Sequence, residues 1–174
     1  AQNNTEILFK FRDSIYHNHR DYWFKTRAYT HAFACNKIYK REIFKDLRYP
    51  IEKKFEDVWL LPNIIQQCQT IATTACGYYH YYYNPHGITA TADGKVLQDL
   101  LNAHLKAFEQ YQNADYYLSI LNVQIDVYNR LKAPILLPYK RYWTSFKLVL
   151  VSCLGVKTTC KIMNLLYKWR QRNR

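Results

Sequence analysis

The chain has 174 residues, enough for one domain with its own core or for a piece of a larger one. Its 25 Lys and Arg residues outnumber 13 Asp and Glu, and the formal net charge of +12 predicts an anionic partner: nucleic acid, acidic lipid or a phosphorylated substrate. The aromatic content of 17% is typical of proteins that bind single-stranded nucleic acid. Sugar-binding clefts are also rich in aromatic rings, so composition leaves both classes open. No apolar segment follows the polar residues 1–4, which argues against a secretory signal peptide.

The N-terminal part of the chain predicts a helix, a strand and a short helix, in that order. Residues 5–33 carry apolar positions spaced for one helix face, namely Ile7, Leu8, Phe11 and Ile15. Residues 32–35 form a short apolar run that predicts a strand. Residues 41–46 suit one or two helical turns, which end before Pro50 because the residue preceding a proline avoids the helical region.

The middle of the chain predicts a helix, a strand and a turn. We expect a helix to begin at Glu56, with Pro62 tolerated only near its start. Its apolar side is formed by Val58, Leu61, Ile64 and Ile65. Residues 70–83 are rich in β-branched and aromatic residues and alternate from Tyr78 onwards, so they predict a strand. Residues 84–87, with the sequence Asn-Pro-His-Gly, predict a turn.

Roughly the last 80 residues, from Asp93 onwards, are predicted to be helical. Asp93 can cap a helix whose apolar face ends at Phe108, and a second helix is expected over residues 114–131. Two prolines then bracket a linker. The run 146–156 has only 11 residues, which is too short to span a bilayer, and we expect Gly155 to interrupt the final helix.

The five cysteines fit neither a disulfide framework nor a paired zinc site, since their number is odd and their spacings are irregular. We therefore expect reduced, mostly buried thiols and a cytosolic compartment.

The most informative stretch combines three short motifs. Residues 34–44 read ACNKIYKREIF, and they are followed by LRYP at 47–50 and FEDVW at 55–59. This arrangement resembles the second half of family 2 glycosyltransferases of the GT-A fold, in which an NKLYKRELF stretch precedes an RFPEGKxxED stretch at about this separation. The resemblance continues through the tyrosine-rich residues 81–83 and through 86–89, and it covers roughly residues 32–92.

The resemblance implies a set of site residues. Inverting sugar transfer needs a carboxylate that deprotonates the acceptor hydroxyl, and by resemblance this base is Asp57, assisted by Glu56. A position near a helix N-terminus is expected to stabilise the ionised carboxylate. The residues expected to bind substrate are Asn36, Lys37, Trp59 and His86.

Each of these residues also has an ordinary structural interpretation. An acidic pair often begins a helix simply because negative charge is favourable there. Lys37 is either a surface charge or a contact for donor phosphates, and Asn36 more often braces the end of a strand. His86 departs from the family pattern, which often has arginine in this loop, and solvated loop histidines are common.

The family also implies parts that this sequence lacks. The GT-A fold binds its nucleotide on an N-terminal parallel sheet and holds Mn²⁺ or Mg²⁺ through an Asp-x-Asp motif, and no Asp-x-Asp occurs here. We therefore expect on the order of a hundred further residues of nucleotide-binding fold in the intact enzyme, and no cofactor held by this portion alone. The expected domains are an acceptor-side part of the catalytic domain over 1–92 and a helical C-terminal region over 93–174.

The expected fold is α+β and helix-rich, and the expected function is transfer of a sugar from a nucleotide-sugar donor to a saccharide or lipid-linked acceptor in surface polysaccharide synthesis. The basic segments at 139–143 and 157–174 suit either a packed helix with a solvated basic face or peripheral contact with anionic lipid on the cytoplasmic side of the plasma membrane. A nucleic-acid-binding module and a membrane-surface or partner-docking module are the alternative functions.

Overall fold

The fold is helix-rich with a small amount of β-structure, which confirms the predicted class. The computed structural model describes residues 10–77, 79, 80, 82, 84–132 and 134–173. Its helices are α1 (His19–Lys25), α2 (Glu56–Gln67), α3 (Ile88–Thr91), α4 (Gly94–Phe108), α5 (Ala114–Leu131) and α6 (Phe146–Arg172). The strands β1 (Ser14–Tyr16) and β2 (Ile71–Thr73) form an antiparallel pair, and 3₁₀ turns lie at Ala28–Thr30, Ala34–Asn36 and Arg41–Phe44.

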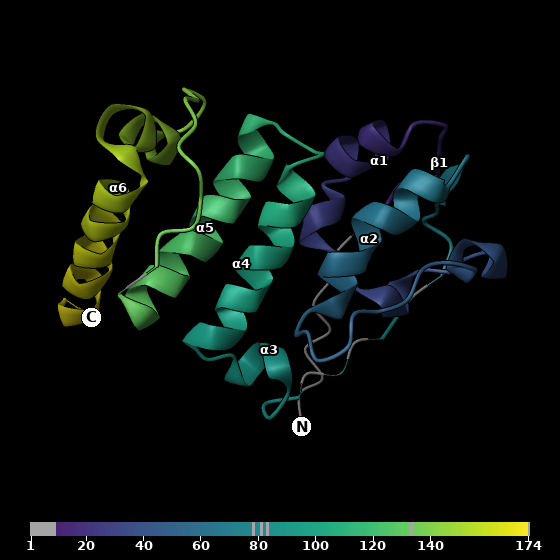
Figure 1. Ribbon diagram of the computed structural model, residues 1–174, viewed down its shortest axis with the longest axis horizontal. Coiled ribbons are helices and arrows are strands. Elements are labelled where there is room, and N and C mark those ends of the chain that lie inside the picture. Colours follow the sequence, from purple (N-terminus) through teal and green to yellow (C-terminus); the bar gives the residue numbers. More distant parts are fainter. Residues whose placement is uncertain (1–9, 78, 81, 83, 133, 174) are drawn as a thin grey trace.

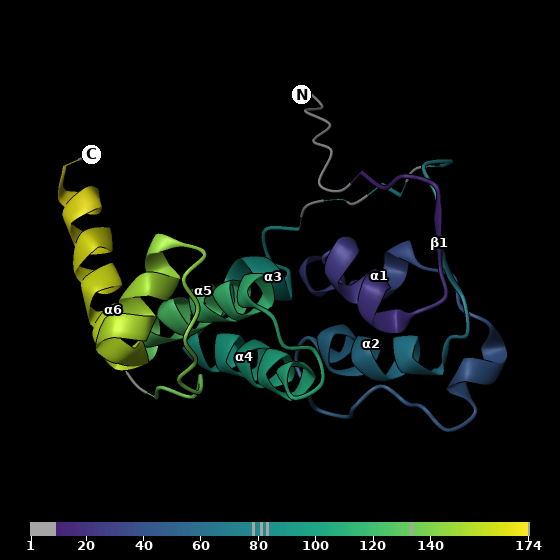
Figure 2. The ribbon, with the colours of Figure 1, turned by 90° about the horizontal axis from the view of Figure 1, so that it is seen from above.

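The helices form a row across the molecule. In Figure 1, α4 and α5 lie side by side in the middle, α6 flanks α5, and α1 and α2 lie on the other side of α4. Figure 2 shows the same order from above, with the C-terminal part of α6 projecting away from the rest of the helices. The strand pair β1–β2 lies at the end of the molecule opposite α6 (Figure 1), whereas the turn Ala28–Thr30 packs into the middle, where Tyr29 contacts Tyr116 of α5.

The N-terminal segment differs from the predicted helix over residues 5–33, of which Ile7 and Leu8 lie outside the described residues. Residues 14–16 form β1, and α1 begins only at His19. Ile15 is 66% exposed, so the apolar spacing does not mark a buried helix face. The Asn18 side chain accepts a hydrogen bond from the backbone N of Arg20 (2.8 Å), and this cap fixes the start of α1.

The strand predicted over residues 32–35 is wrong, because the chain makes a 3₁₀ turn at Ala34–Asn36 instead. The Lys37 ammonium donates to the carbonyl oxygens of His31 and Phe33, at 2.7 Å each. In a strand, carbonyls two residues apart would lie about 7 Å from each other, too far to share one ammonium. The short helix predicted within residues 41–46 is confirmed as the turn Arg41–Phe44.

Helix α2 begins at Glu56 as predicted, but the position of Pro62 differs from the expectation. Pro62 lies in the middle of α2 and is buried, although proline was expected only in the first turn. A proline inside a helix removes one backbone hydrogen bond and crowds the preceding turn. The apolar side of α2 buries Leu61 and Ile65 in the core, and this burial offsets the cost of the proline.

The strand predicted over residues 70–83 is confirmed only at Ile71–Thr73. Its length is set by its partner, because β1 offers three residues for pairing, with Ser14 opposite Thr73 and Tyr16 opposite Ile71. Beyond the pair, the Asp13 carboxylate accepts a hydrogen bond from the backbone N of Ala75 (2.7 Å) and turns the chain away. Tyr78, Tyr81 and Tyr83 lie outside the described residues, so the alternation predicted from Tyr78 onwards is not tested there. The turn predicted over residues 84–87 is confirmed.

The helical C-terminal half agrees closely with the prediction. The Asp93 carboxylate caps α4 by accepting a hydrogen bond from the backbone N of Val96 (2.8 Å). The Asn113 side chain caps α5 by accepting one from the backbone N of Tyr116 (2.7 Å). The linker after α5 is held by Gln124, whose amide accepts hydrogen bonds from the backbone N of Leu136 and of Leu137. Gly155 interrupts α6 as expected, with φ 80° and ψ 165°.

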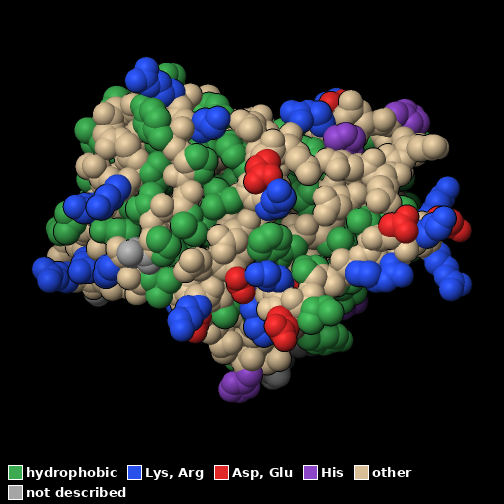
Figure 3. Space-filling model, in the orientation of Figure 1, with side chains coloured by type: hydrophobic (Ala, Val, Ile, Leu, Met, Phe, Trp, Pro, Cys, Tyr) green, Lys and Arg blue, Asp and Glu red, His purple; other side chains and the backbone are tan. Residues whose placement is uncertain are grey.

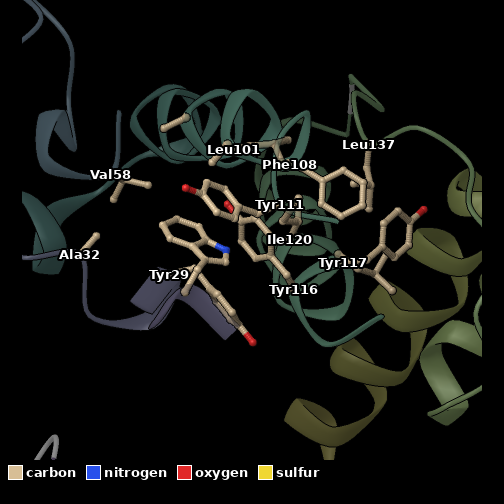
Figure 4. Close-up of a cluster of buried hydrophobic side chains, with 14 of the residues drawn as sticks. Tyr29, Ala32, Val58, Leu101, Phe108, Tyr111, Tyr116, Tyr117, Ile120 and Leu137 are labelled. Atoms are coloured by element: carbon tan, nitrogen blue, oxygen red, sulfur yellow. The ribbon is translucent and has the colours of Figure 1, made fainter. Parts of the chain in front are cut away.

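A single aromatic core joins the N-terminal and C-terminal parts of the protein (Figure 4). The Trp23 ring of α1 stacks on Tyr111 at 4.5 Å between ring centroids and meets the ring of Tyr116 edge-on at 5.4 Å. Tyr116 also packs against Tyr29 and Phe108. Much of the high tyrosine content of the sequence is therefore explained by packing inside the protein.

Replacing Lys132 by glycine should stabilise the fold by about 0.5–1 kcal/mol. Lys132 ends α5 with φ 61°, a left-handed conformation that glycine adopts without steric cost, and its side chain is exposed. Urea unfolding of Lys132→Gly and of Lys161→Gly measures the effect, with Lys161 as an exposed control inside a helix. The explanation fails if Lys132→Gly lowers the midpoint as Lys161→Gly should.

The cysteines are free, but they are not mostly buried as predicted. Cys35, Cys76 and Cys153 are exposed, Cys68 is half-buried, and Cys160 is buried. The prediction fails because three of the five residues fall on turns or on the outward side of α6, where burial does not follow from the apolar character of the side chain.

Candidate active site

The acidic pair Glu56–Asp57 begins α2 directly after a strained residue. Phe55 precedes the pair with φ 57° and ψ 43°, and it makes no side-chain hydrogen bond to the helix. Bulky residues rarely adopt this left-handed conformation, which costs on the order of 1–2 kcal/mol, and such strain clusters at functional sites. The backbone is therefore held in an unfavourable conformation at the point where the candidate base enters the helix.

The environment of Asp57 raises the proton affinity of its carboxylate. Burial of the half-buried side chain is the largest cause, and it raises the pKa of Asp57 above its ordinary value. The backbone N of Val58 donates to Asp57 Oδ1 at 2.8 Å, and this bond lowers the pKa, as does the nearby Lys37 ammonium. The sequence predicted that the helix N-terminus would dominate and stabilise the ionised form. Burial has the larger effect instead, because the hydration free energy that the carboxylate loses exceeds the stabilisation that the helix dipole provides.

Lys37 is a half-buried cation that holds the loop around it and also lowers the pKa of Asp57. Its ammonium donates to the carbonyl oxygens of His31 and Phe33 and to Asn36 Oδ1, each at 2.7 Å. Burial lowers the pKa of Lys37 to about 8, although the Asp57 carboxylate raises it. All three protons of the ammonium have protein acceptors, so Lys37 shapes the loop around it rather than pointing freely into solvent.

A groove of about 880 Å³ lies beside these residues, between the segment 36–43, α2 and β2. Asn36, Lys37 and Tyr39 line one side, and Leu61 and Ile65 of α2 line the other. Asp57 precedes Leu61 by four residues and therefore shares its helix face. Asp57 itself is not among the residues that line the groove. Lys37 links the two, because it lines the groove and is close enough to the Asp57 carboxylate for each charge to shift the pKa of the other.

The structure thus brings together Asn36, Lys37 and Asp57, while the other predicted residues lie elsewhere. Glu56 is exposed in the first turn of α2. Trp59 packs against the core with the Lys53 ammonium 5.5 Å from its ring centroid, and it does not line the groove. His86 is exposed in the loop before α3, where its backbone N donates to Asn84 Oδ1 at 2.9 Å. The substrate-binding roles of Trp59 and His86 stay predictions.

Sequence reasoning missed the polar residues that line the far side of the groove. Gln67, Gln69 and Thr70 follow α2 and lead into β2, and all three are exposed. The available signal was the change from a helical to a β-strand pattern after Gln67, which marks a loop at the mouth of the groove. Tyr39 lies within the recognised stretch 34–44 and was not singled out.

The described residues offer a half-buried carboxylate and a groove, and no group of three or more His, Cys, Asp and Glu side chains among them could hold a metal ion. A carboxylate of raised pKa next to a groove can accept a proton from a hydroxyl bound there. Comparison with known proteins adds no family: no family model, no curated protein and no solved structure matches this chain.

Proposed function

We propose that this chain is the acceptor-side part of an inverting family 2 glycosyltransferase, in which Asp57 deprotonates the acceptor hydroxyl. The observation that carries the proposal is the environment of Asp57: the carboxylate is half-buried, burial raises its pKa, and it lies within electrostatic reach of Lys37, which lines the groove. A base with increased proton affinity is more effective at removing a proton from an alcohol. The groove volume lies within the usual range for sites that bind small molecules.

In this proposal each residue near the groove has a defined role. Lys37 holds the turn at Ala34–Asn36 in shape, and its charge favours the ionised form of Asp57, as does the stronger effect of the hydrogen bond from the backbone N of Val58. The strained Phe55 fixes the direction in which Asp57 leaves the backbone. The exposed amides and hydroxyl of Gln67, Gln69 and Thr70 offer hydrogen bonds to a saccharide in the groove.

The remaining components belong to the intact enzyme. We propose a nucleotide-sugar donor, a divalent metal bound outside this portion, and a saccharide or lipid-linked acceptor in surface polysaccharide synthesis. The free cysteines suit a reducing compartment, so we place the enzyme in the cytoplasm.

In the full-length enzyme, Asp57→Asn should lower the turnover of sugar transfer by about 10²–10⁴-fold while leaving the affinity for the donor unchanged. Radiolabelled sugar transfer measures turnover, and calorimetry with the nucleotide-sugar measures donor binding. Asn keeps the size of the side chain and its ability to accept from Val58, so the loss reports on the proton rather than on folding.

Asp126→Asn is the matched control for this experiment. Asp126 lies on α5, and burial raises its pKa as it raises that of Asp57. Its replacement should leave turnover within about twofold of the unchanged enzyme, since it removes a similar carboxyl far along the chain from the groove. Turnover that survives Asp57→Asn would show that Asp57 is not the base.

The nucleic-acid alternative has less support from the structure than from the composition. Tyr29, Tyr111, Tyr116 and Tyr117, which contributed to it, are buried in the core and have no free ring face for stacking on bases. The alternative would still predict affinity for single-stranded oligonucleotides that falls steeply with added salt.

A further inference from the structure

The net positive charge of this protein is concentrated in its last 48 residues. Residues 127–174 contain 11 of the 25 Lys and Arg residues and no Asp or Glu. Residues 1–126 contain the other 14, set against all 13 acidic residues, and are therefore nearly neutral. In the view of Figure 3, the side of the molecule formed by α6 shows blue and green side chains and no red ones.

The part of α6 that follows Gly155 carries four of these cations on one face, while Arg170 lies on the opposite side of the helix. Lys157, Lys161, Lys168 and Arg172 are spaced by four, seven and four residues, so they form one stripe along the helix. All four side chains are exposed. The residues that attach this part of the helix to the protein, Thr159 and Cys160, are buried and lie on another side.

An apolar stripe runs next to the basic one. Leu165 and Trp169 are four residues apart and expose 65% and 63% of their surfaces. By the helical period they lie directly beside Lys161 and Arg172. We call these six exposed residues the basic-apolar face, namely Lys157, Lys161, Leu165, Lys168, Trp169 and Arg172.

We propose that the basic-apolar face docks this protein on a membrane surface that contains anionic lipid. An interfacial helix places its apolar side chains among the lipid acyl chains and its basic side chains at the headgroups, and Trp prefers the boundary between the two. Lysine and arginine reach back to the headgroups along their aliphatic stems. Each exposed cation near such a surface adds to the attraction, and no acidic residue in this segment opposes it.

Other occupants of this face fit the observations less well. A second copy of the chain would bring the same uncompensated positive charge against it. Nucleic acid would satisfy the charge but would leave Leu165 in water. By length and composition α6 is long and apolar enough to cross a membrane, but a third of its most apolar stretch is buried inside the protein and Gly155 breaks it. A helix lying on the surface keeps both features intact.

The test is vesicle flotation of the full chain with neutral phosphatidylcholine vesicles and with vesicles that contain about 30% phosphatidylglycerol, in about 50 mM salt. We expect binding to the anionic vesicles only. The variant Lys161→Gln/Lys168→Gln/Arg172→Gln should bind about a hundredfold more weakly. Leu165→Ser/Trp169→Ser should bind at least tenfold more weakly at unchanged net charge.

The control is Lys45→Gln/Lys54→Gln/Lys95→Gln, which removes the same charge from exposed lysines before α6 and should retain most of the binding. Equal binding to neutral vesicles, or equal loss in both triple variants, would overturn the proposal. So would a chain that binds a single-stranded oligonucleotide through Lys161, Lys168 and Arg172 and leaves the vesicles unbound. The inference does not rest on sugar transfer, since vesicle binding is measured without donor or acceptor.

Discussion

Replacing Trp23 by alanine should cost about 3–5 kcal/mol of unfolding free energy, which is a large part of the stability of a domain of this size. The side chain is 1% exposed and lies at the meeting point of α1, α4 and α5. Its ring stacks on Tyr111 and contacts Tyr116, so truncation leaves a cavity that these rigid neighbours cannot fill. Urea unfolding followed by circular dichroism measures the loss.

Two further variants make the Trp23 result specific. Trp143→Ala removes a tryptophan that is 63% exposed and should change stability by less than about 0.5 kcal/mol. Trp23→Phe keeps a ring and removes an indole N–H that is buried with no hydrogen-bond partner in the described part of the chain, so it should cost less than Trp23→Ala. A loss below about 1 kcal/mol for Trp23→Ala would show that the N-terminal part does not share the core.

Acidification should destabilise the protein by about 3 kcal/mol between pH 7 and pH 4 through His104 alone. His104 lies in α4 with its ring nitrogen 3.1 Å from the Tyr116 hydroxyl. Burial lowers the pKa of His104 from 6.5 to about 4. The folded protein therefore keeps this ring neutral, while the unfolded chain takes up a proton as the pH falls below 6.5. The stabilisation is complete above pH 6.5 and is lost as the pH approaches 4.

Urea unfolding at several pH values between 4 and 7 tests this expectation. His104→Gln removes the titrating group and should flatten the pH dependence, whereas His86→Gln changes an exposed histidine and should leave it as it is. His31 should also destabilise the fold on acidification, since burial lowers its pKa as well. Asp57 and Asp126 should offset part of this loss of stability, because their raised pKa values let the folded state take up protons more readily than the unfolded chain. The His104 assignment is wrong if His104→Gln retains the full slope.

The C-terminal helices could be predicted closely because their signals are local. Helix α5 runs over the predicted residues, since Asn113 caps its start and its apolar face repeats with the helical period. Gly155 was recognised as an interruption because glycine alone tolerates its conformation. Nothing outside these segments is needed to define them.

The N-terminal third could not be predicted in the same way, because contacts distant in sequence decide its structure. Strand β1 exists only because β2 pairs with it, and the Asp13 carboxylate accepts from the backbone N of Ala75, 62 residues further along the chain. The sequence named Asp57 and Lys37 as candidates, but burial controls the pKa values of both, and burial is a property of the assembled fold. Propensity and spacing carry no such information.

The unequal distribution of charge also gives the protein a large electric dipole. Residues 1–126 carry a net charge of +1 and residues 127–174 carry +11, and α6 lies at the opposite end of the molecule from β1 (Figure 1). A negatively charged surface exerts a torque on such a dipole over about 10 Å in physiological salt, so that α6 is turned toward the surface. The groove beside α2 is then on the side of the protein furthest from the surface. Under the proposed sugar transfer, an acceptor anchored in that surface would need a saccharide long enough to extend from α6 to α2, and the breadth of the protein would set a lower limit on its length.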